Sequence, residues 1–154
     1  MAEGTVSVFN EFAESVADGR IDLDTDTFKV AFTSTVPADT DAVPTWGAGG
    51  TTNESSNEVS AGGGYTAGGE TLGSVTFSQS SGVATFDGAN ITWTSSGSGD
   101  PTNIKSAILY SDTATNKDCV AWIDMTADGG TTAISLLAND IILNITSGLL
   151  TITV

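Results

Sequence analysis

The middle of this chain reads NEVSAGGGYTAGG from Asn57 to Gly69. This segment holds five of the 18 glycines around one tyrosine, Tyr65. Glycine clusters let a backbone adopt positive φ or approach another segment closely. A short helix-like segment, one clear strand and a polar loop precede it, and strand-and-turn sequence follows it. We therefore interpret it as the entry to a β-sheet domain in which Tyr65 packs beside the glycines.

Short apolar segments with alternating polar residues, separated by turn residues, fill most of the chain. Phe28, Val30 and Phe32 alternate before the glycine segment, and a similar alternation continues to Val154. Strands spaced about 8–12 residues apart with turn signals between them indicate a sandwich or barrel. We predict a mainly β fold, a single antiparallel, jelly-roll-like β-sandwich domain over residues 1–154, with one short N-terminal α-helix.

The predicted helix covers residues 6–18. The apolar residues of one helical face recur at i, i+3, i+4 and i+7: Phe9, Phe12, Ala13 and Val16. Gly19 suits the position just past the helix end. A helix of this length is marginal alone, so its apolar face must dock on the domain's own sheet or on a partner subunit.

We predict a long surface loop over residues 34–56, because this segment holds two of the three prolines and several glycines. Loops beyond about 12–15 residues usually carry function or are mobile. Trp46 is the one large apolar residue in this loop. It has two interpretations: it packs back onto the domain, or it anchors a contact, since Trp is enriched at interface hot spots.

The chain is strongly acidic, with four Lys and Arg against 19 Asp and Glu and a net charge of −15. Such a chain repels phosphate backbones and anionic membrane surfaces, so we expect no nucleic-acid or membrane partner. No segment approaches the roughly 20 apolar residues of a membrane span. No secretory signal pattern begins the chain, and we expect synthesis in the cytoplasm.

Few residues here suit catalysis. The absence of histidine excludes Ser-His-Asp and Cys-His catalysis and His-ligated zinc. Cys119 lies in an apolar run, where a thiol usually acts as a small buried hydrophobe. The glycine segment lacks the Lys-Ser/Thr ending of a phosphate-binding loop, and no carboxylate pair stands out for glycoside hydrolysis. We expect no enzymatic activity and no cofactor.

One acidic run, DLDTD from Asp22 to Asp26, begins like a calcium loop. Thr27 stands where that loop needs glycine, and Thr33 stands where it needs a bidentate glutamate. The run therefore predicts a turn in which Asp side chains cap local N–H groups, with no bound metal. A looser calcium or magnesium site at Asp22, Asp24 and Asp26 is the alternative.

Five short motifs follow one another along this chain. GxIDLDTDTxKVAF is followed by NEVSxxGGYTAGGxxL, FDxAxITW, AxLY and AxID. They stand at Gly19 to Phe32, Asn57 to Leu72, Phe86 to Trp93, Ala107 to Tyr110 and Ala121 to Asp124. This order resembles a family of tailed-bacteriophage virion structural proteins, and the resemblance spans nearly the whole chain.

The resemblance implies a non-enzymatic capsid decoration (cement) protein that binds the outer surface of the major capsid protein shell and stabilises it. It also implies a homotrimer on the exterior of the virion. The acidic composition suits the exterior better than the DNA-lined interior. The alternatives are a tail or neck component, or a glycan-binding adhesion module that uses Trp46 or Tyr65.

We predict that contact with the capsid or with sister copies uses Phe9, Phe12, Trp46 and Tyr65. The phenylalanines lie on a helix too short to be stable without docking. A fully buried aromatic side chain at an interface can contribute about 2–4 kcal/mol, and a repeated lattice multiplies that contribution through avidity. In the alternative, the helix and the loop simply complete the domain's own core.

Overall fold

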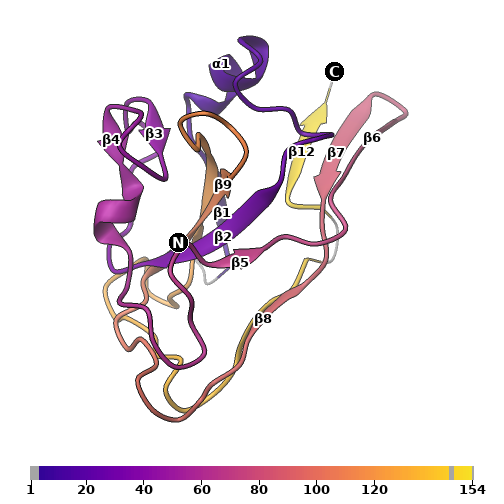
Figure 1. The fold of residues 1–154 in the computed structure, drawn as a ribbon. Coiled ribbons are helices and arrows are strands. Elements are labelled where there is room, and N and C mark those ends of the chain that lie inside the picture. The colour runs from indigo at the N-terminus through magenta and orange to yellow at the C-terminus, as the bar shows by residue number, and fades with distance from the viewer. Residues whose placement is uncertain (1–3, 146–147, 154) are drawn as a thin grey trace.

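Antiparallel strands dominate this chain. The structure is a computed structural model that describes residues 4–145 and 148–153 (Figure 1). The elements are β1 (Val6–Val8), α1 (Phe12–Ala17), β2 (Phe28–Thr33), β3 (Pro44–Thr45), β4 (Thr52–Asn53), the 3-10 helix η1 (Glu54–Asn57), β5 (Glu70–Thr71), β6 (Thr76–Ser80), β7 (Val83–Asp87), β8 (Ile91–Trp93), β9 (Ser106–Ser111), β10 (Cys119–Asp124), β11 (Ile141–Leu143) and β12 (Leu150–Thr153). Within the described residues, only β3 and β4 pair in parallel. The mainly β fold is confirmed, and the predicted strand end at Val154 lies outside the described residues.

Five strands form the central sheet, in the order β1-β10-β9-β2-β5. β2 and β9 pair over their full lengths, from Phe28 opposite Ser111 to Thr33 opposite Ser106. Every residue of β9 and β10 is buried, and Lys29 is the one residue of β2 that is not. The central sheet is therefore covered on both faces.

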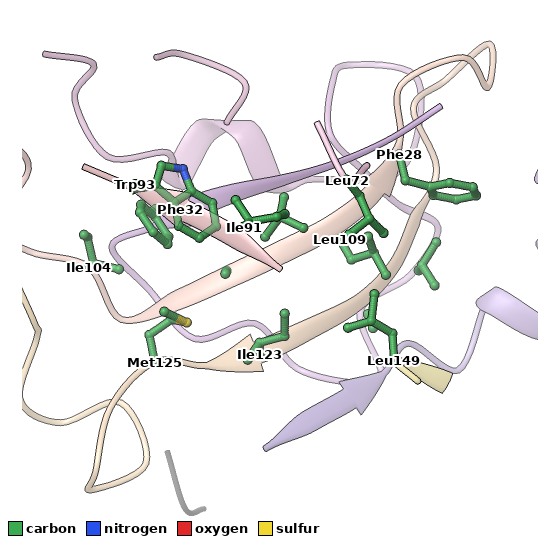
Figure 2. Packing of buried hydrophobic residues seen from close by; sticks show 14 of the residues in the cluster. Phe28, Phe32, Leu72, Ile91, Trp93, Ile104, Leu109, Ile123, Met125 and Leu149 are labelled. Carbon is green, nitrogen blue, oxygen red and sulfur yellow. The ribbon is translucent and has the colours of Figure 1, made fainter. Parts of the chain in front are cut away.

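The first face of the central sheet packs against a second layer of strands. This layer consists of the three-stranded sheet β12-β7-β6 and the two-stranded ribbon β11-β8. The ring of Phe28 meets Phe86 with centroids 4.9 Å apart, and Phe32 meets Trp93 at 4.3 Å. Figure 2 shows Trp93 lying over Phe32 in this core. Two layers of antiparallel strands around one apolar core make the fold sandwich-like, as predicted.

The second face of the central sheet is covered by the segment predicted to be a loop. Trp46 from this segment stacks on Tyr110, with ring centroids 5.1 Å apart and planes 12° apart. Trp122 joins the same buried cluster, and its Nε1 donates a hydrogen bond to Asp39 at 2.8 Å. The prediction of a surface loop over 34–56 is wrong in part, because the segment holds β3, β4 and the start of η1 and buries Trp46.

The prediction of a helix over residues 6–18 is wrong in its first half. Val6 pairs opposite Ile123, so the β-branched start of the chain forms edge strand β1 instead. Phe9 joins the cluster on the second face, whereas Phe12 joins the main core. Residues 6–18 therefore hold a strand, a turn and a helix of six residues, and the two phenylalanines flank the turn.

The end of α1 follows the sequence prediction. Gly19 has φ of +70° and donates its N–H to Val16, while the next N–H, from Arg20, reaches Ser15. These two bonds close the helix end in the arrangement that favours glycine.

The tyrosine of the glycine segment closes the outer edge of β2. β5 pairs with β2 at two residues, so the N–H of Phe32 has no partner in that strand. The Tyr65 hydroxyl accepts this N–H at 3.0 Å and donates to Glu58 Oε1 at 2.8 Å. Tyr65 also pairs with Gly62 through two backbone bonds, which confirms that it packs beside the glycines.

The glycines permit a close approach between this segment and the loop after β8. The Asp100 carboxylate accepts hydrogen bonds from the N–H groups of Gly64, Ser96 and Gly97. A Cβ on Gly64 would overlap the carbonyl oxygen of Thr94. The two loops can therefore meet only where this position lacks a side chain.

We predict that Gly64→Ala lowers the free energy of unfolding by about 2–3 kcal/mol, because the new methyl group forces the two loops apart. Urea unfolding of the purified chain measures the effect. Gly47→Ala is the matched control, since a Cβ at Gly47 meets nothing within 4 Å, and it should change stability by less than about 0.5 kcal/mol. Equal effects of the two substitutions would contradict the close approach.

Candidate interaction surface

The four residues predicted to make an interface are all buried in the domain. Phe9, Phe12, Trp46 and Tyr65 are between 1% and 7% exposed. Phe9 and Trp46 lie in the cluster on the second face, whereas Phe12 and Tyr65 lie in the main core. The structure does not bring the four together at one surface. It favours the alternative in which the N-terminal segment and residues 34–56 complete the domain's own core.

Phe12 does reach the wall of an apolar groove. The groove lies between β1, α1 and β12 and has a volume of about 560 Å³, within the range of roughly 300–1,000 Å³ that is typical of binding pockets. Its lining residues, nearly all apolar, are Val6, Val8, Phe12, Ala13, Val16, Leu149, Leu150, Thr151 and Ile152. Figure 1 shows α1 and β12 at the same end of the molecule.

The groove continues into a second hollow of about 360 Å³, which shares Val16 and Ile152 with it and reaches Phe77 on β6. Three large apolar side chains on this continuous surface, Val8, Phe77 and Ile152, are 39–46% exposed. Exposed apolar residues gathered on one surface usually mark an interaction site. The surface that combines the groove and the second hollow is called the apolar groove below.

Sequence reasoning missed this site. Ile152 alternates with Thr151 and Thr153, a pattern that indicates one apolar face of a strand. The pattern does not show whether that face meets the core or a groove. The groove exists because β1 and β12, from opposite ends of the chain, lie on either side of it, and their placement depends on pairing with β10 and β7.

Acidic side chains flank the apolar groove at its second hollow, which Asp22 and Asp24 line. The backbone N–H of Asp24 and the Thr25 side chain and backbone lower the pKa of Asp22, so its carboxylate stays ionised at neutral pH. Arg20 lies close by, but its guanidinium is bound to Glu11 at 3.0 Å and to Asp118 at 2.9 Å.

The acidic run from Asp22 to Asp26 forms the predicted turn. Asp22 Oδ1 accepts N–H bonds from Asp24 at 2.9 Å and Thr25 at 3.2 Å. Asp26 Oδ2 accepts the N–H of Asp22 and the hydroxyl of Ser111. Within the described part of the chain, no three Asp, Glu, Cys or His side chains are grouped to hold a metal ion. The loose calcium or magnesium site therefore gains no structural support.

Cys119 is buried as the sequence indicated. Burial raises the pKa of its thiol well above the usual value. A thiol that stays protonated is a poor nucleophile, so Cys119 acts as a packing residue in the cluster around Trp46 and Trp122.

Glu54 on η1 is a buried carboxyl group that no sequence pattern singled out. It is 2% exposed, and its Oε1 has no hydrogen-bond partner among the described residues. Burial, and then the charge of Asp41, raises the pKa of Glu54 to about 7. The segment that covers the second face of the sheet therefore carries a group that ionises near neutral pH.

Comparison with known proteins adds no identification: no family model, curated protein or solved structure matches this chain. None of the helices in the described residues is long and apolar enough to cross a membrane.

We predict that Trp46→Ala lowers the free energy of unfolding by about 3–5 kcal/mol, because it removes a buried ring from the second face. Thermal and urea unfolding of the free protein measure the loss. Phe77→Ala, at an exposed aromatic residue, is the control and should cost far less. If Trp46→Ala melted like the parent but weakened binding to a partner, the anchor interpretation would replace the core interpretation.

We predict that Glu54→Gln stabilises the chain at pH 8 by about 1–3 kcal/mol and has little effect near pH 4.5. Below about pH 4.5 Glu54 is protonated in both folded and unfolded chains. Between about pH 4.5 and 7 only the folded chain retains the proton, so stability falls as pH rises. The neutral amide avoids this loss.

Unfolding free energies measured from pH 4.5 to pH 8 test the Glu54 prediction. Glu58→Gln is the control, because Glu58 Oε1 accepts bonds from Tyr65 and Gly68. That substitution should destabilise the chain at neutral pH. If the stability difference between Glu54→Gln and the parent stayed constant with pH, the pKa of Glu54 would be the same in the folded and unfolded chains, and the prediction would be wrong.

Proposed function

We propose that this chain is a non-enzymatic structural protein of a tailed bacteriophage. In this proposal it is a capsid decoration (cement) protein that binds the outer surface of the major capsid protein shell and stabilises it. The observation that carries the proposal is the ordered set of family-like motifs from Gly19 to Asp124. Two of those motifs supply the parts on which the fold depends, namely β2 and the segment around Tyr65.

The apolar groove supports a binding role for this chain. A cement protein needs a surface that attaches to the shell and has no need of catalytic groups. The groove offers exposed Val8, Phe77 and Ile152 for such a contact. The net charge of −15 favours solubility before assembly and a position away from packaged DNA.

The proposal includes a homotrimer on the exterior of the particle, at points where several shell subunits meet. Three copies held together on a lattice gain affinity through avidity, because each further contact forms at high effective concentration. The partners in this proposal are therefore the major capsid protein and sister copies of the chain.

A glycan-binding role through Trp46 or Tyr65 is less compatible with their surroundings. Sugars bind on exposed aromatic faces, whereas Trp46 stacks on Tyr110 and Tyr65 stacks on Phe32. A tail or neck component would use the same kind of surface as a cement protein. Its location on the particle separates these two roles.

The test uses particles of the encoding phage produced without this gene, to which the purified chain is added. We expect the chain to co-sediment with the particles, to saturate at three copies per occupied capsid position and to raise the melting temperature of the shell. A density map of the decorated particle then locates the chain. Absence of binding, or copies found only on the tail, would overturn the capsid proposal.

A further inference from the structure

We infer that the apolar groove takes an extended apolar segment of a partner protein, carrying Lys or Arg at its flanks, which adds as a strand to β12. This inference rests on the proposed function in taking the groove as the contact surface. It goes further by stating the conformation and the chemistry of the occupant.

The edge of β12 supports the strand-like conformation. β12 is the edge strand of the sheet β12-β7-β6. Among the described residues its strand neighbour is β7, from Leu150 opposite Phe86 to Thr153 opposite Val83. Half of the N–H and C=O groups of an edge strand point away from its neighbour. An extended segment in the groove can pair with these groups, as in recognition by strand addition.

The shape and lining of the groove support an apolar segment. Val16 and Leu150 lie in its wall, and Val8 and Ile152 are exposed at its rim. Successive side chains of a strand point to opposite faces. Every second side chain of an added strand would therefore enter the groove, while the others remain in solvent.

Charge favours a basic partner over a second copy of this chain. Three of the four basic residues, Arg20, Lys29 and Lys117, are already in ion pairs with acidic side chains. Two copies would bring together two net charges of −15, which repel each other. Lys or Arg at the flank of a partner segment would instead meet Asp22 and Asp24 at the second hollow.

The test is selection of binders to the immobilised chain from a displayed library of random twelve-residue peptides. We expect the enriched peptides to alternate apolar and polar residues and to carry Lys or Arg near an end. A synthetic copy of the most enriched peptide is then titrated against variants of the chain. Ile152→Asp should weaken its binding at least about tenfold, and Asp24→Asn should weaken it less and reduce its salt dependence.

Ile142→Asp is the matched control, because Ile142 is a strand isoleucine of similar exposure, 53%, that does not line the groove. It should change binding less than about twofold. Phe77→Ser serves as a second groove variant in case Ile152→Asp unfolds, and melting curves of all variants show which are folded. Three outcomes would each overturn the inference. Ile152→Asp could bind the peptide as tightly as the parent chain does, the enriched peptides could be acidic, or no peptide could be enriched.

Sedimentation of the free chain tests the rival occupant. We expect a monomer. An oligomer that Ile152→Asp dissociates and Ile142→Asp preserves would mean that a second copy fills the groove. The inference and the proposed function can fail separately. If the chain binds particles but selects no groove-dependent peptide, the inference is wrong and the proposed function stands. If it selects such peptides but does not bind the shell, the proposed function is wrong and the groove remains a binding site.

Discussion

The hydrogen bond between the Tyr65 hydroxyl and the N–H of Phe32 is the contact on which the central sheet depends. β2 is buried on both faces, so an unpaired N–H at its edge would cost about 1–3 kcal/mol. Burial raises the pKa of Tyr65, which keeps the hydroxyl protonated and able to donate to Glu58. The ring stacks on Phe32, and Phe32 in turn packs on Trp93. One side chain therefore links the glycine segment, the sheet edge and the main core.

The two faces of the central sheet are covered in different ways. The main core is almost wholly apolar, whereas the cover of the second face contains the buried Glu54 and the bond from Trp122 to Asp39. The short strands β3 and β4 pair over only two residues. Local opening begins where apolar contacts are few and backbone pairing is short. The cover holds a buried carboxyl group whose contribution to stability falls as pH rises from about 4.5 to 7.

Local sequence signals predicted the elements that depend on local chemistry. Strand alternation identified β2, and the glycine cluster correctly indicated a close approach. The signals failed where long-range pairing decided the outcome. Val6 to Val8 forms a strand because β10 offers an edge, and Trp46 is buried because Tyr110 on the central sheet lies beneath it. The register of β10 shifts between Cys119 and Ala121, and Val120 packs in the main core. No local sequence pattern predicts this shift.

The net charge of −15 limits which partners the exposed strand edge of β12 can accept. The unpaired N–H and C=O groups of an edge strand such as β12 can pair with a strand of another copy. A net charge of −15 on each copy opposes that pairing in solution. Under the proposed function, a basic segment of the shell would lower the local negative charge as it fills the groove. Sister copies could then approach one another on the particle although they repel in solution. Under the proposed function, trimer formation would follow attachment to the shell, and the order of assembly would result from electrostatics.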